Sequence, residues 1–203
     1  MLFLWQAHLT FILLGFVLLG SLRATHGWRP WLLPLLAVTS FVPLNGLPLA
    51  AYVRSYTDDL AITTLVFLGW ASLSRLGVVQ PLQRPARLQV LLQFAGLALS
   101  LYPATLGLTY FDPYRWGFNP RPMIVLTGLA ALVLLWLRNG LAVAMLALAT
   151  LAFALRLKAS ENYWDYLIDP LLAGYCLIAA IMLAAKALWQ RLRRPSTAAT
   201  PSI

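Results

Sequence analysis

The fold is decided by residues 168–189, which read IDPLLAGYCLIAAIMLAAKALW. The stretch is apolar apart from Asp169 at its start and Lys186 near its end. About 20 apolar residues are enough for a helix to cross the hydrocarbon core of a bilayer. Acidic residues precede the stretch, and the basic segment 191–194 follows it. It therefore predicts a membrane-spanning helix whose two ends carry opposite charge.

The rest of the chain repeats this pattern. Further apolar segments lie at 2–22, 31–53, 60–77, 88–110, 122–137 and 141–157. All six acidic residues fall in three alternate gaps between segments, whereas the other gaps and the C-terminal end hold ten of the 15 cations and no acid. Lys and Arg are retained on the cytoplasmic side of membrane proteins. The sequence therefore predicts an all-α protein with seven transmembrane helices, the N-terminus outside and the C-terminus cytoplasmic.

Composition supports this class. The chain is 61% hydrophobic and 10% charged, whereas a soluble domain carries roughly a quarter charged residues. The net charge of +9 is spread over many gaps, so it does not form the stripe that binds nucleic acid. We expect a bacterial inner-membrane protein with a seven-helix domain over 1–190 and a disordered, basic cytoplasmic tail over 191–203.

One segment is ambiguous. Segment 31–53 contains Pro43 and Pro48 around Asn45-Gly46. If it entered and left the bilayer on one side, every later gap would change sides and the basic C-terminal end would be exported. The charge pattern favours a full crossing.

The two short segments 122–137 and 141–157 are joined by Arg138-Asn139-Gly140. Asn-Gly supplies the positive φ angles of a tight turn. The pattern predicts an antiparallel helical hairpin.

Three outward gaps carry dense polar and aromatic sequence, and they supply the candidate site. A short helix over 160–168 would place Glu161 and Asp165 on one face. Carboxylates beside aromatic rings suit sugar hydroxyls, and arginine suits phosphate. The candidate ligand-binding residues are Arg54, Asp58, Asp59, Asp112, Arg115, Trp116, Arg121, Glu161, Trp164 and Asp165.

Structural roles compete with this interpretation. Asp169 before Pro170 is a typical helix N-cap. Asp58 and Asp59 suit the positive end of the following helix, and Asp112 before a proline can initiate a turn. Tyr and Trp at this depth also form the interfacial belt of membrane proteins.

Several classes of function lack their essential residues. The sequence has no His-Glu-x-x-His motif, no Gly-x-Ser-x-Gly motif and no Gly-rich phosphate loop. The apolar segments hold almost no ionisable residue for an ion-coupled relay. Clustered carboxylates could hold a hard cation, but no spacing resembles a known metal loop. We therefore predict no catalytic residue, no metal and no cofactor.

The stretch Arg54-Ser55-Tyr56-Thr57-Asp58-Asp59-Leu60-Ala61 resembles a membrane-domain segment of sulfatase-fold phosphoglycerol transferases, the lipoteichoic acid synthases and their relatives. That segment places an Arg shortly before Asp-Leu-Ser, and Ala61 stands here in place of Ser. The resemblance implies a role in the envelope near lipid headgroups. It implies no catalysis, because that family acts through a large soluble domain that these residues do not contain.

The leading hypothesis is a non-catalytic inner-membrane subunit or a lipid or glycolipid headgroup-binding protein. Its partners would be lipid headgroups and a membrane or periplasmic protein. In this hypothesis the arginines hold phosphate, the carboxylates bind hydroxyls, and Trp116 and Trp164 stack.

Two alternatives remain open. The first is a lipid transporter or flippase. Its cavity would be lined by a helix broken at 43–48, with Gln6, His8 and Gln93 facing it. The second is an integral transferase that uses an outer carboxylate as its base.

Overall fold

The chain is helical in the computed structural model, which describes residues 4–22 and 27–193. Helix accounts for 75% and strand for 2%, which confirms the all-α prediction. The helices are α1 Leu4–Leu19, α2 Arg29–Ser40, α3 Leu49–Thr57, α4 Ile62–Arg75, α5 Arg84–Thr105, α6 Arg121–Trp136, α7 Gly140–Ala154, α8 Trp164–Leu167 and α9 Pro170–Leu192. The 3-10 helix η2 covers Pro113–Phe118, and the strands are β1 Pro43–Leu44 and β2 Leu47–Pro48.

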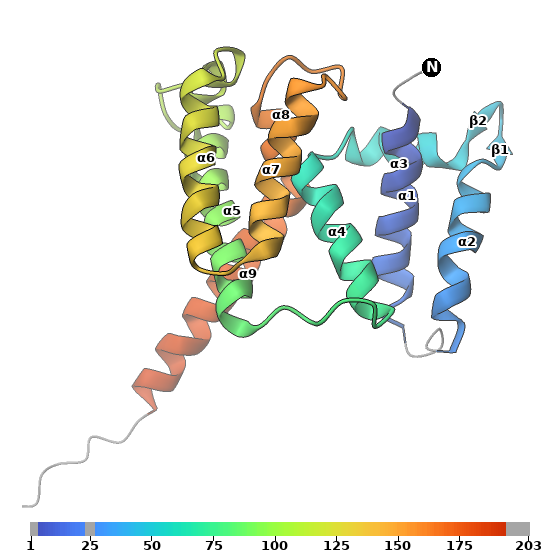
Figure 1. Cartoon of the computed structure of the whole chain (residues 1–203), viewed down its shortest axis with the longest axis horizontal. Helices are drawn as coiled ribbons and strands as arrows, with labels where there is room; N and C mark the ends of the chain where they lie inside the picture. Colours follow the sequence, from blue (N-terminus) through green and yellow to red (C-terminus); the bar gives the residue numbers. More distant parts are fainter. Residues whose placement is uncertain (1–3, 23–26, 194–203) are drawn as a thin grey trace, which may run out of the picture.

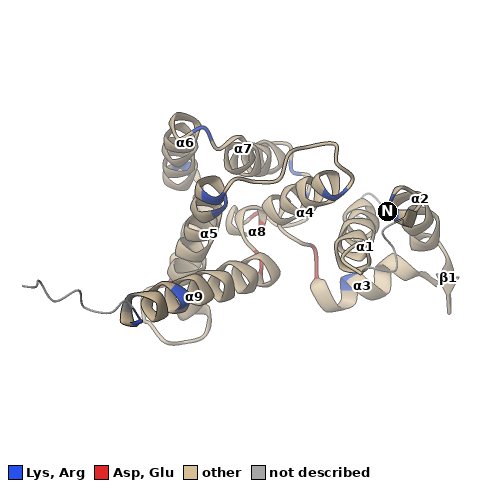
Figure 2. Ribbon diagram, turned by 90° about the horizontal axis from the view of Figure 1, so that it is seen from below, with Lys and Arg blue, Asp and Glu red and all other residues tan. Residues whose placement is uncertain are grey.

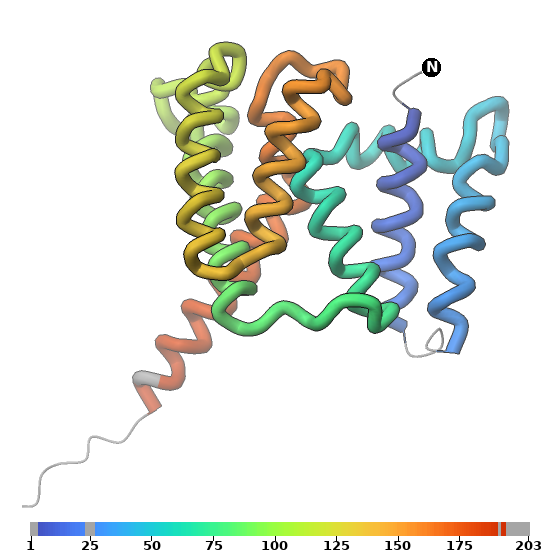
Figure 3. Tube along the Cα trace, viewed as in Figure 1, coloured from blue at the N-terminus to red at the C-terminus, as the bar shows by residue number. Residues whose placement is uncertain are grey.

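The long helices run alternately down and up in the view of Figure 1, in the order α1, α2, α4, α5, α6, α7 and α9. The tube in Figure 3 shows the same path, with the connections gathered at two ends. We call the upper connections, 41–61, 106–120 and 155–169, the acidic end, because they contain all six acidic residues. The lower connections include 76–83 and 137–139, and we call them the basic end. Seen from below in Figure 2, Lys and Arg lie at the near ends of α4 and α5 and between α6 and α7.

The prediction of one helix over 31–53 is wrong. Helix α2 ends at Ser40, and the chain then forms an antiparallel hairpin and the helix α3 across the acidic end (Figure 1). Asn45 has φ 49° and Gly46 has φ 84°, the positive angles of a two-residue hairpin turn. Because α4 starts at the end where α2 finished, the later connections still lie at the ends that the charge pattern predicted.

Helices α6 and α7 form the predicted hairpin, but the turn differs in detail. The positive φ belongs to Arg138, at 59°, while Asn139 has φ −97°. The Asn139 side chain accepts a bond from the backbone N–H of Ala142, so it caps α7. Its Nδ2 also donates to the carbonyl of Ala86 at 2.9 Å, which ties the hairpin to α5.

Two of the described helices are long and apolar enough to cross a membrane, Arg84–Thr105 and Pro170–Gln190. Only 33% and 17% of their apolar windows are buried inside the protein. A core helix of a water-soluble protein would bury most of that surface, so these helices fit a membrane protein. Three shorter apolar helices are α1, α6 and α7.

The main hydrophobic core lies where α4, α5, α7, α8 and α9 meet, around Phe94, Tyr163 and Tyr166. A smaller cluster of Phe16, Leu32 and Leu36 joins α1 to α2. Helix α9 continues past the predicted domain boundary at residue 190, and the predicted tail beyond residue 193 lies outside the described residues.

Candidate functional site

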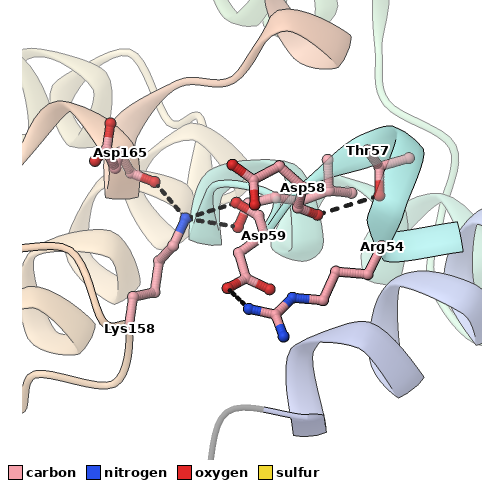
Figure 4. Close-up of polar contacts among 7 residues, drawn as sticks. Arg54, Thr57, Asp58, Asp59, Lys158 and Asp165 are labelled. Atoms are coloured by element: carbon pink, nitrogen blue, oxygen red, sulfur yellow. Dashed lines mark hydrogen bonds and ion pairs between the residues drawn. The ribbon is translucent and has the colours of Figure 1, made fainter. Parts of the chain in front are cut away.

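A polar cavity of about 560 Å³ opens at the acidic end. It is bounded by the end of α3, the end of α5, η2 and the segment 158–170. Its polar lining consists of Arg54, Thr57, Asp58, Asp59, Tyr102, Thr105, Tyr114, Lys158, Ser160, Asp165 and Asp169. Four of the ten predicted site residues are in this set. Figure 4 shows how several of its side chains lie.

Lys158 connects several segments of the acidic end, a role that no sequence pattern predicted. Only 6% of the residue is exposed. Its Nζ donates to the carbonyls of Asp59 at 2.7 Å, Asp165 at 2.8 Å and Leu60 at 3.1 Å (Figure 4). These three acceptors match the three donors of an ammonium group. Lys158 therefore joins the start of α4 to α8.

Burial lowers the pKa of Lys158, while the charges of Asp165 and Asp59 act in the opposite direction. All three of its donors are occupied by backbone carbonyls. The side chain therefore supports the cavity wall and has no donor left for a ligand.

Asp59 connects α3 to the cavity. Its Oδ2 accepts a bond from Nη2 of Arg54 at 2.7 Å in a half-buried ion pair (Figure 4). Its other oxygen, Oδ1, is buried and has no hydrogen-bond partner among the described residues. A buried carboxylate oxygen without a donor is costly, so a donor that reached this atom would stabilise the site.

Asp58 has strained backbone geometry. It follows the last residue of α3 with φ 55° and ψ −166°, a region that is essentially restricted to glycine. Among the described residues its carboxylate has no hydrogen bond or ion pair, and the residue is exposed at the cavity wall. Strain of this kind persists where the surrounding structure imposes it, commonly at functional sites.

Asp165 lies on α8 and accepts bonds from Tyr114 Oη at 3.2 Å and from the Ser160 hydroxyl. Burial first, and then the charge of Asp165, raise the pKa of Tyr114 to about 12. The phenol therefore stays protonated and keeps donating to the carboxylate at neutral pH. This pair forms the wall of the cavity between η2 and α8.

The predicted role of Asp169 as a helix cap is confirmed, and the same side chain also binds the start of a second helix. Its Oδ1 accepts from the N–H of Leu172 in the first turn of α9, and its Oδ2 accepts from the N–H of Ala61 before α4, both at 2.8 Å. One buried carboxylate thus holds the N-terminal ends of two helices. Both of its oxygens are engaged, so Asp169 closes the floor of the cavity.

Helix η2 packs closely against the segment that leads into α8, and the closest approach is at Gly117. A Cβ atom there would lie 1.7 Å from Oδ1 of Asn162. The backbone carbonyl of Gly117 accepts from Tyr163, and Nδ2 of Asn162 donates to the carbonyl of Tyr114 at 3.0 Å. This docking holds Tyr114 at the cavity, and the sequence carried no motif for it.

The predicted helix over 160–168 is wrong. Only Trp164–Leu167 is helical, because Asn162 turns the chain and accepts a bond from the N–H of Trp164. Glu161 is exposed and lines a neighbouring cavity with Arg156, away from Asp165.

The other predicted residues also lie outside the polar cavity. Asp112 caps η2 by accepting from the N–H of Tyr114, as its turn role predicted. Arg115 and Arg121 are exposed. Trp116 and Trp164 line an apolar cavity of about 730 Å³, and Nε1 of Trp164 donates to the carbonyl of Pro113. Of the three arginines predicted at the site, only Arg54 therefore lines the polar cavity.

The residues named for a transport path do not meet. The hairpin at 43–48 is almost wholly exposed and lines none of the cavities described. Nδ1 of His8 is hydrogen-bonded to the hydroxyl of Ser40, whereas Gln93 lines the apolar cavity. Gln6 is fully buried without a hydrogen-bond partner for its amide among the described residues.

Among the described residues, no group of three or more His, Cys, Asp or Glu side chains is arranged to hold a metal ion. No family model matches the chain, and no curated protein or solved structure is similar to it.

Proposed function

We propose that this chain is a seven-span protein of the bacterial inner membrane that binds a lipid or glycolipid headgroup at its outer, periplasmic face. It serves envelope biogenesis without catalysing a reaction itself, alone or beside a partner protein. The polar cavity is the binding site. The single observation that carries the proposal is the unpaired carboxylate of Asp58, held on strained backbone at the wall of that cavity.

The membrane arrangement is supported by the alternating helices and by their exposed apolar faces. Large side chains such as Trp31 on α2, Leu132 on α6 and Ile181 on α9 are more than 60% exposed. Such surface is stable in lipid and not in water. Helices of 14 to 16 residues measure about 21 to 24 Å, so they require tilt or a thinned bilayer.

The orientation follows from charge. The basic end carries cations without acids, and such an end is retained in the cytoplasm. The acidic end then faces the periplasm, and the polar cavity opens at the level of the outer headgroups.

The chemistry of the cavity favours a hydroxyl-bearing headgroup. Its lining holds four carboxylates and two cations. Lys158 is fully used by carbonyls, and Arg54 is paired with Asp59. The remaining groups are therefore mainly acceptors, because the hydroxyls of Thr57 and Thr105 already donate to backbone carbonyls. Acceptors and phenol rings suit the donors of a sugar or polyol better than a bare phosphate.

The test uses the full chain in detergent micelles and a dihexosyl diacylglycerol as the probe. A ligand that binds only the folded protein raises the midpoint of thermal unfolding. We expect the glycolipid to raise the midpoint of the wild type more than phosphatidylglycerol does. Asp58→Asn should lose most of this shift, because the carboxylate charge is removed without a change of shape.

Glu161→Gln is the matched control, since it removes one negative charge from the same end but outside the cavity. It should respond to the glycolipid as the wild type does. An equal response of Asp58→Asn and the wild type would refute the site, and so would an equal loss in both variants.

A further inference from the structure

Another cavity, of about 550 Å³, lies along α4 and reaches the basic end. It is enclosed mainly by α1, α4, α5 and the start of α9. Its wall is apolar, with side chains such as Leu14, Phe67, Trp70, Leu91 and Tyr175. The volume is typical of pockets that hold a small ligand. We call it the basal cavity.

The basal cavity is elongated along α4. It extends from Thr64 in the first turn of this helix to Arg75 at its last residue. At 1.5 Å per residue these positions are about 16 Å apart along the helix. An apolar space of this length suits a hydrocarbon chain that enters from the basic end.

Two arginines line this cavity at the basic end. Arg75 ends α4 and Arg87 lies in the first turn of α5, and both line the cavity. One nitrogen of Arg75 donates to the carbonyl of Val17, which holds the guanidinium in place. The guanidinium of Arg87 has no hydrogen bond or ion pair among the described residues, and none of the described residues that line the cavity is acidic.

We propose that the basal cavity binds one anionic phospholipid of the leaflet at the basic end. Its phosphate pairs with Arg87 and Arg75, and one acyl chain lies along α4. The guanidinium fork matches two phosphate oxygens, and basic recesses between membrane helices select anionic lipids. The site is distinct from the polar cavity in position, charge and ligand.

The test is native mass spectrometry of the full chain titrated with phosphatidylglycerol, with phosphatidylcholine of the same acyl chains as the reference. We expect the wild type to retain phosphatidylglycerol preferentially. Arg87→Gln should weaken that binding by about fivefold to tenfold. Arg84→Gln is the matched control, because Arg84 is exposed on the same helix and does not line the cavity.

A second variant separates the acyl chain from the headgroup. Ala71 lines the cavity wall, so Ala71→Phe should fill the space and reduce binding while both arginines remain. Wild-type binding by Arg87→Gln, an equal loss in Arg84→Gln, or full binding by Ala71→Phe would each overturn the proposal. Asp58→Asn should bind phosphatidylglycerol as the wild type does. The proposal for the basal cavity can therefore fail without the proposal for the polar cavity, and the reverse also holds.

Discussion

At the residue scale, the polar cavity combines side chains that are fully used by the fold with a few that are not. The three donors of the Lys158 ammonium group bind backbone carbonyls, and both carboxylate oxygens of Asp169 accept from backbone N–H groups. The carboxylate of Asp58 and Oδ1 of Asp59 have no hydrogen bond or ion pair among the described residues. This difference separates the scaffold of the cavity from the groups available to a ligand.

Asp58→Gly should stabilise the protein and abolish glycolipid binding. Glycine relieves strain of about 1 to 3 kcal/mol at φ 55° and costs about 0.5 to 1 kcal/mol in chain entropy, so a net gain of roughly 1 kcal/mol is expected. Equilibrium unfolding in mixed micelles measures the gain. Asp58→Asn retains the strain and should show wild-type stability. If Asp58→Asn raised the free energy of unfolding as much as Asp58→Gly does, the strain argument would be contradicted.

Lys158→Met should lower the free energy of unfolding by about 3 kcal/mol, because three buried carbonyls lose a charged donor. The same unfolding measurement applies. The chain offers an ideal control in Lys186→Met, since Lys186 is an exposed residue of α9. Equal stability of the two variants would show that the Lys158 bonds add nothing.

Tyr114 makes stability depend on pH in the alkaline range. Its pKa is about 12 in the folded protein and 10 in the unfolded chain, so the folded state holds the proton between these values. This contribution is complete below pH 10 and is lost as the pH rises through 12. We expect the thermal midpoint of the wild type to fall more steeply from pH 10 to pH 12 than that of Tyr114→Phe. Parallel curves would exclude the role assigned to the Tyr114–Asp165 pair.

At the scale of the elements, the acidic end is assembled by short helices that dock on one another. The Asn162 side chain packs against Gly117 of η2, and Lys158 joins α8 to the start of α4. Lys158 and Asp165 are only seven positions apart, but Lys158 and Leu60 are 98 positions apart, and Asn162 and Tyr114 are 48 apart. The cavity therefore depends on the docking of η2 and α8.

Gly117→Ala should disrupt this docking. The added Cβ would meet Asn162 and Trp164 side chains closer than van der Waals contact allows, so the thermal midpoint should drop and the connection 106–120 should become sensitive to protease. Gly128→Ala in α6 meets nothing within 4 Å and should leave both readouts unchanged. Normal docking in Gly117→Ala would show that the η2 contact is dispensable.

The sequence predicted some elements well and others not. Charge in the gaps predicted which connections share an end, because charge depends on composition alone. Segment 31–53 looked like one span because its turn at Asn45-Gly46 is flanked by apolar residues on both sides. Glu161 and Asp165 have helical spacing, yet Asn162 turns the chain between them. The role of Lys158 depends on carbonyls about 100 positions away, which no local pattern reports.

At the scale of the whole molecule, the two ends differ in charge and in the cavities they hold. The acidic end carries a polar cavity rich in carboxylates, and the apolar cavity that reaches the basic end is lined there by two arginines. This polarity agrees with a protein that meets different lipid chemistry in the two leaflets. Both proposals follow from that one asymmetry.

The most direct test of the central claim is native mass spectrometry of the chain gently extracted from its own membrane. The account predicts a retained lipid with a hydroxyl-rich headgroup, present on the wild type and on Glu161→Gln and lost from Asp58→Asn. A chain that carries no such lipid, or that keeps it in Asp58→Asn, would contradict the assignment of the polar cavity as a headgroup site.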